Sequence, residues 1–113
     1  MGFSSVEDVR AIEREAPWSQ RDLPITLYDM LDKTANKMPD ANAVSFQLMS
    51  GPNSKAETLS WSQLRAQVIQ AANLFSRLGI GESDVVAFVL PNSMETVVAL
   101  LGGAVAGIVS PIN

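Results

Sequence analysis

The sequence predicts an α/β fold of the three-layer type, and two observations lead to this prediction. Two apolar runs, at about 84–90 and 108–112, are too short for helices and lack polar alternation, as in strands of a parallel sheet that are covered on both faces. Between them, residues 93–106 carry apolar side chains at helical spacing. A strand, a helix and a strand joined this closely form a βαβ unit with a right-handed crossover. The chain therefore contains one nearly complete unit of a parallel sheet.

The first 24 residues are expected to form a helix and a connector. Ser5 is placed as the N-cap of an amphipathic helix that runs to residue 16, and Asp8 completes a box-like start. Pro17 ends this helix, and its stability should depend on docking of its apolar face. In the connector that follows, Arg21 and Asp22 are expected to be solvated.

A second helix is predicted over about 26–38. Thr26 caps it, and the carboxylate of Asp29 is expected to reach back to the start of the helix. Ile25 and Met30 have the spacing of a hydrophobic staple. Pro39 then closes the element.

A hairpin and a third helix are expected next. Two strands, at about 43–49 and 57–61, flank a polar loop whose central residues, 51–53, are Gly-Pro-Asn. Ser60 and Gln63 have the spacing of a capping box that starts a helix over 61–78. Its buried stripe should run along Leu64, Val68, Ala71, Phe75 and Leu78. Gly79 is placed for a left-handed C-cap at the end of this helix.

Composition excludes several classes of function. The chain has 113 residues, a net charge of −4 and neither cysteine nor histidine. Nucleic acid is therefore not an expected partner, and disulfides, zinc sites and Cys-His or Ser-His catalysis are excluded. The N-terminus does not read as a signal or transit peptide, and the longest apolar window, 96–112, is shorter than the roughly 20 residues of a membrane span. A soluble, cytoplasmic protein is expected.

The candidate binding residues lie at the carboxyl ends of the two parallel strands, where open sheets bind their ligands. They are Asn92, Ser93 and Asn113, which we predict to stand at the edge of a pocket. Either Asn92, with Glu95 three positions on, or Ser93 can be the N-cap of the following helix, and capping alone explains both residues more readily than a binding role does. No pattern identifies a catalytic or metal-binding residue.

The glycines do not predict a nucleotide site. A dinucleotide fingerprint places its glycines after a strand and before a helix, whereas Gly79 and Gly81 lead from a helix to a strand. The late glycines of the next helix, Gly102 and Gly103, are better suited to close packing. No cofactor-binding residue is therefore predicted, and the acidic residues nearby (Glu82, Asp84 and Glu95) are assigned to turns and caps.

Several longer stretches together resemble the N-terminal region of the adenylate-forming superfamily, closest to the acyl-CoA synthetases. The resemblance covers residues 23–113, and its most specific segments, in chain order, are WSQL, AANLFSRLGI, SDVVAFVLPNS and GGAVAGIVSPIN. It implies an enzyme that uses ATP and Mg²⁺ to convert a carboxylic acid to an acyl-adenylate and then passes the acyl group to coenzyme A. The resemblance suggests a fatty or medium-chain acid as the substrate.

None of that family's catalytic motifs matches a residue of this chain. The resemblance therefore implies that residues 25–113 are an incomplete N-terminal subdomain, a scaffold that binds no cofactor and is inactive alone. Exposed apolar surface could then drive self-association. Two alternatives stay open: a stand-alone interaction or acyl-binding module on the same scaffold, and an unrelated flavodoxin-like nucleotide binder.

Overall fold

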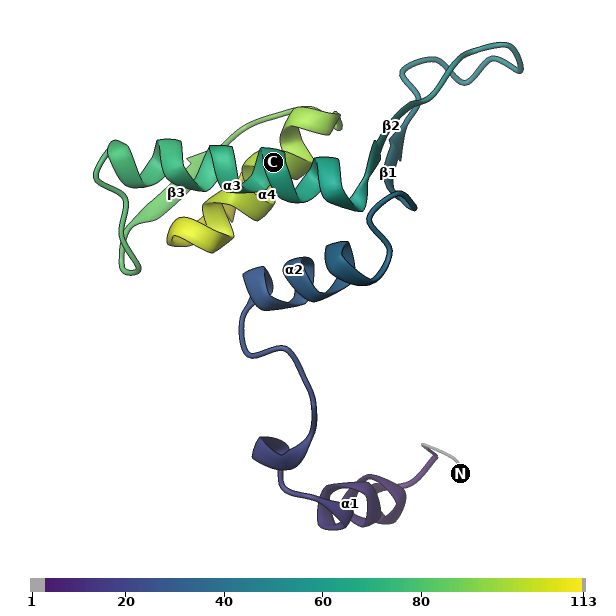
Figure 1. Ribbon diagram of the computed structural model, residues 1–113, viewed down its shortest axis with the longest axis vertical. Coiled ribbons are helices and arrows are strands. Elements are labelled where there is room, and N and C mark those ends of the chain that lie inside the picture. The colour runs from purple at the N-terminus through teal and green to yellow at the C-terminus, as the bar shows by residue number, and fades with distance from the viewer. Residues whose placement is uncertain (1–3, 113) are drawn as a thin grey trace.

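The computed structural model describes residues 4–112, and it has the mixed α/β fold that the sequence predicts (Figure 1). In this part of the chain the elements follow in the order α1 (Val6–Glu15), the 3₁₀ turn η1 (Trp18–Gln20), α2 (Leu27–Lys37), β1 (Asn42–Phe46), β2 (Glu57–Ser60), α3 (Trp61–Arg77), β3 (Val85–Phe88), α4 (Met94–Ala106) and β4 (Ile108–Pro111). Figure 1 shows α1 apart from the other helices, and the β1–β2 hairpin reaching away from the body of the protein.

The predicted βαβ unit is confirmed. β3 and β4 pair in parallel, with Val85 opposite Ile108 and Phe88 opposite Pro111, and α4 connects them. Two details of the prediction were wrong. The first strand ends at Phe88 rather than at residue 90, and Val85 is 52% exposed, so the strand is not covered on both faces. Within residues 4–112, α4 covers only one face of this two-stranded sheet, which explains the exposure of the other.

α4 packs between α3 and the β3–β4 sheet, and two consecutive glycines make this possible. A Cβ atom on Gly102 would lie 2.6 Å from the Cβ of Ala71 in α3. A Cβ on Gly103, which faces the sheet, would lie 3.3 Å from a methyl carbon of Val109. These glycines therefore have the close-packing role that the sequence predicts for them.

The predicted hairpin also forms, with shorter strands than expected. β1 and β2 pair antiparallel from Asn42 opposite Ser60 to Phe46 opposite Glu57, with an irregularity near the start of β1. The expected continuation to residue 49 was wrong, because the chain enters the loop after Phe46, where the Gln47 side chain donates to the carbonyl oxygens of Gly51 and Ser54. Leu48 and Met49, assigned to the strand, are 82% and 68% exposed in the loop.

α3 begins and ends as its sequence signals predict. The Ser60 hydroxyl accepts the N–H of Gln63, whose side chain accepts the N–H of Ser60. At the other end Gly79 has a φ of +91°, and Ile80 donates its N–H to the carbonyl of Phe75, as in a Schellman motif. The helix itself ends at Arg77, and the prediction that Leu78 is buried was wrong, since it is 70% exposed.

The core lies where α2, α3 and α4 meet the hairpin. Its centre consists of Leu31, Leu64 and Val68, which are 5%, 2% and 0% exposed. Partly buried apolar side chains surround this centre: Ala43, Val44, Leu59, Trp61, Val97, Val98, Leu101 and Val105. Because β1 contributes Val44 and α4 contributes Val97, the core fixes the hairpin beside the start of α4.

The start of α2 differs from its prediction in one respect. As expected, Thr26 accepts the N–H of Asp29, and the carboxylate of Asp29 reaches back to accept the N–H of Ile25. Ile25 is 94% exposed, so the predicted staple with Met30 does not form. Lys33 connects α2 to the segment before it, since its Nζ lies 3.3 Å from Asp22 and 3.6 Å from Asp29.

No helix in residues 4–112 combines the length and apolar character that crossing a membrane requires.

Candidate functional site

The candidate residues at the end of β3 line a pocket of about 200 Å³ that they share with the hairpin. α4 and the residues just before it contribute Asn92, Ser93, Thr96 and Val97, and β1 contributes Val44, Ser45 and Phe46. The two sets are brought together by the core described above. Asn113, the third candidate, lies outside the described residues.

Ser93 is the N-cap of α4. Its hydroxyl accepts the backbone N–H of Thr96 at 3.2 Å, which decides between the two caps that the sequence left open. Asn92 precedes the cap and is exposed. Both residues line the pocket, so capping and a place at its edge are compatible for Ser93.

Thr96 belongs to this site and was not singled out from the sequence. Its hydroxyl lies 3.2 Å from the Ser93 hydroxyl and donates a hydrogen bond to the carbonyl oxygen of Pro91. Thr96 thereby connects the first turn of α4 to the residues that leave β3. The Ser-x-x-Thr spacing could have indicated it, but the same spacing occurs wherever a serine caps a helix.

Glu95 lies in the first turn of α4, between the pocket-lining residues Ser93 and Thr96 in the sequence. Its pKa lies below the ordinary value of a glutamate, because the polar groups at the start of α4, its own backbone N–H first and then the Ser93 hydroxyl, favour the charged carboxylate. An acidic side chain in the first turn also interacts favourably with the positive end of the helix dipole. Glu95 is therefore part of the cap, as the sequence predicts.

Replacing Ser93 by alanine is expected to raise the pKa of Glu95 toward its ordinary value and to cost about 1 kcal/mol of stability through the lost cap. A lowered pKa in the folded state contributes stability above the unfolded-state pKa, and this contribution is lost as the pH falls through the folded-state pKa. The alanine variant should therefore lose less stability than the wild type on acidification.

NMR titration of the Glu95 carboxyl measures the shift in its pKa. Ser93→Thr, which keeps the hydroxyl, should retain the low pKa, and an unchanged Glu95 pKa in Ser93→Ala would contradict the assignment.

The pocket presents uncharged hydrogen-bonding groups and apolar side chains. It presents two serine hydroxyls, a threonine hydroxyl and an amide beside apolar side chains, without a titratable lining residue. Within residues 4–112 there is also no group of three acidic side chains placed to hold a metal ion. Such a surface can shape a binding site and donate hydrogen bonds.

The family of AMP-binding enzymes matches residues 31–113, which is most of the chain. The chain belongs to the AMP-binding enzyme family. Its relatives include the marinolic acid–CoA ligase of Pseudoalteromonas sp. (strain SANK 73390), 39% identical over 113 residues that cover 96% of this chain and 16% of that protein. The long-chain-fatty-acid–AMP ligase FadD26 of Mycobacterium marinum (strain ATCC BAA-535 / M) is 33% identical over 94 residues, which cover 82% of this chain and 15% of that protein.

Solved structures of AMP-binding enzymes share this fold. The fatty acyl CoA synthetase of Mycobacterium tuberculosis superposes with a TM-score of 0.63 and 27% identity over 78% of this chain and 16% of that one. The fatty acid AMP ligase of Legionella pneumophila has a TM-score of 0.68 at 23% identity, over 77% of this chain and 15% of that one. The chain thus spans about a sixth of the length of these AMP-binding enzymes.

Proposed function

We propose that these 113 residues are the N-terminal part of an ATP-dependent acid–thiol ligase of the AMP-binding family. The parent enzyme would convert a fatty acid and ATP, with Mg²⁺, to an acyl-adenylate and pyrophosphate, and then transfer the acyl group to coenzyme A with release of AMP. The observation that supports this most is the 39% identity to a CoA ligase over almost the whole chain. A cytoplasmic location is part of the proposal.

Within that enzyme, the segment described here would serve as scaffold. The pocket bounded by Asn92, Ser93 and β1 lies at the carboxyl end of β3, where parallel sheets bind ligands. We propose that it forms one edge of the site for the acid or its acceptor, and that Asn113 continues this edge. The catalytic groups and the residues that hold ATP would come from other parts of the polypeptide.

The longer polypeptide encoded with this segment provides the test. With ATP, Mg²⁺ and a long-chain fatty acid it should support pyrophosphate exchange, and acyl-CoA should appear only when coenzyme A is added. Acetate in place of the fatty acid separates a fatty acyl ligase from an acetyl ligase, since both kinds occur among the relatives. Accumulation of acyl-adenylate that coenzyme A does not discharge would overturn the thiol-ligase assignment while leaving adenylation intact.

The 113-residue chain alone should show no pyrophosphate exchange. It should also self-associate, because the open face of the β3–β4 sheet exposes 52% of Val85 and 50% of Ile108. Light scattering across concentration measures the association, and a strictly monomeric chain would contradict it. Specific binding of a fatty acid by this chain, with no ligase sequence encoded beyond it, would favour a stand-alone acyl-binding module instead.

A further inference from the structure

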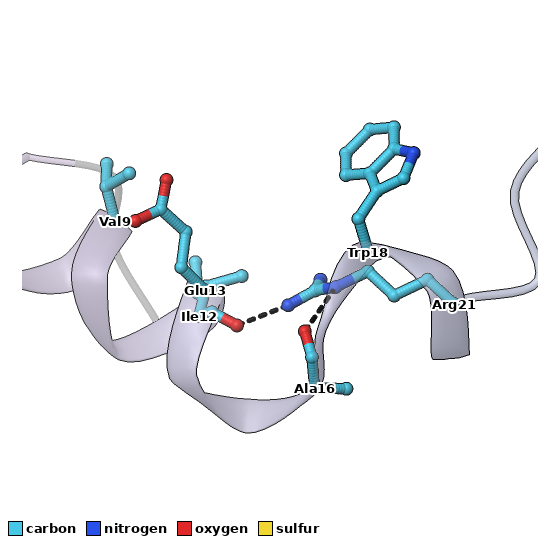
Figure 2. A pocket seen from close by; sticks show the side chains of 6 residues that line it. All are labelled: Val9, Ile12, Glu13, Ala16, Trp18 and Arg21. Atoms are coloured by element: carbon cyan, nitrogen blue, oxygen red, sulfur yellow. Dashed lines mark hydrogen bonds between the residues drawn. The ribbon is translucent and has the colours of Figure 1, made fainter.

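The N-terminal segment carries a second, larger pocket that the proposed function does not use. Its volume is about 380 Å³, and it lies between α1 and the 3₁₀ turn that follows (Figure 2). The lining residues are Val9, Ile12, Glu13, Ala16, Trp18 and Arg21. Figure 2 shows the side chains of Val9, Glu13 and Trp18 rising from the same side of the ribbon. We call this surface the α1–Trp18 face.

The α1–Trp18 face is held in shape by Arg21. The guanidinium group donates hydrogen bonds to the carbonyl oxygens of Ile12 and Ala16, which the end of α1 leaves without helical partners (Figure 2). A cation at this position also interacts favourably with the negative end of the helix dipole. The expectation that Arg21 is solvated was therefore wrong: it folds the connector back against α1 and so fixes Trp18 beside the helix.

Apolar side chains on this face are left uncovered by residues 4–112. α1 has the amphipathic pattern of a helix that packs on a partner, yet none of its residues is buried. Val9 is 44% exposed and Trp18 is 76% exposed. An exposed tryptophan next to an apolar helical stripe is a typical anchor for a protein interface.

Charge argues against a membrane surface or a second copy as the partner. α1 carries four acidic and two basic side chains, a net charge of −2. Two charged residues line the pocket: Arg21 is engaged with the carbonyl oxygens of α1, whereas Glu13 is exposed. Anionic lipid headgroups would repel such a helix, since interfacial helices are typically rich in lysine and arginine. Two copies of the α1–Trp18 face would bring their acidic side chains together.

The size of the face points to a partner that is covalently tethered. At 1.5 Å per residue, the ten residues of α1 give a face about 15 Å long and about 10 Å wide. A stable interface between separate molecules buries about 800 Å² on each partner, several times more. A segment of the same polypeptide acts at an effective concentration near the millimolar range, so a small face suffices.

We propose that the α1–Trp18 face docks on the part of the ligase polypeptide that lies outside these 113 residues, on an apolar surface rimmed by basic side chains. The inference rests on the proposed function. It is supported by the marinolic acid–CoA ligase, a protein about six times as long, which aligns with 96% of this chain and hence with most of α1 and its connector. The family match itself begins only at residue 31.

Amide hydrogen exchange of α1 in the complete ligase and in the 113-residue chain tests the proposal. We expect the peptides that cover residues 6–16 to exchange at least about tenfold more slowly in the complete ligase. Ile12→Glu should abolish this difference. Ala11→Glu introduces the same side chain on the exposed, opposite side of α1 and should leave it within about threefold of the wild type.

Three outcomes would overturn docking. Equal exchange of α1 in the two proteins would show that nothing outside the segment covers the face. Equal effects of Ile12→Glu and Ala11→Glu would show that any protection does not come through the apolar stripe. Slower exchange in the 113-residue chain at higher concentration would show that a second copy covers it. A complete protein that protects α1 but forms no acyl-adenylate would refute the proposed reaction and leave docking standing.

Discussion

Replacing Leu64 by alanine is expected to lower the free energy of unfolding of the 113-residue chain by about 2–5 kcal/mol. Leu64 is 2% exposed and lies in the core with Leu31 and Val68, so its side chain leaves a cavity that the surrounding helices fill only in part. A typical domain has only about 5–15 kcal/mol of stability, so this single change removes a large fraction of it. Urea denaturation followed by circular dichroism measures the loss.

The control is the same substitution at Leu74. This residue lies on the same helix, α3, and is 55% exposed. Leucine and alanine differ little in helix propensity, so Leu74→Ala should change the stability by no more than about 0.5 kcal/mol. Similar losses for the two variants would mean that Leu64 does not occupy the core.

Much of the fold could be predicted from the sequence because hydrogen bonds between residues that are close in the sequence determine where its helices begin and end. Ser60 and Gln63 are three residues apart, and the box they form depends on the backbone between them alone. Gly79 similarly supplies a backbone conformation that other residues rarely adopt. Such signals need no tertiary contact, which is why the start of α3 and its C-terminal cap are where they were predicted.

Strand ends and buried faces could not be predicted in this way. β1 stops at Phe46, where the chain enters a loop in which the Gln47 side chain donates to the carbonyl oxygens of Gly51 and Ser54. Nothing near Leu48 in the sequence shows where this pairing ends. Whether Val85 is covered depends on what packs on the second face of its sheet, and no element within residues 4–112 covers this residue. An apolar run therefore indicates that a strand can be buried on both faces, but it does not show which elements cover those faces.

The candidate pocket shows the same limit. Ser93 could be recognised as a cap, but its place in a pocket depends on Ser45 and Phe46, which precede it by nearly half of the chain. The core around Leu64 and Val68 brings the two segments together. A surface built from both could be found only once that packing was known. Arg21 is a similar case, since its role depends on the chain turning back at Trp18.

Replacing Gly107 by alanine is expected to destabilise the chain by about 3 kcal/mol. The added Cβ would lie 2.5 Å from the carbonyl oxygen of Gly81 and 2.7 Å from that of Asp84. Both are backbone atoms, so the clash is relieved only if the turn before β3 moves away from the end of α4. The Asp84 carbonyl also accepts the N–H of Ile108 at 2.9 Å, the bond that precedes the β3–β4 ladder. Urea denaturation measures the loss, and NMR should show altered Ile108 and Val85 amide signals.

Gly81→Ala provides the matched control, because it adds the same methyl group to the other side of this contact. Its Cβ would meet only the Asp84 carboxylate, at an ordinary 3.5 Å. Where the backbone tolerates alanine, the substitution restricts the unfolded chain and stabilises a protein by about 0.4–1 kcal/mol. The two variants should therefore shift the urea midpoint in opposite directions. A Gly107→Ala chain as stable as the wild type would mean that α4 can end without this close approach, and that the spacing between α4 and the strand leading to Asn92 and Ser93 is not fixed by Gly107.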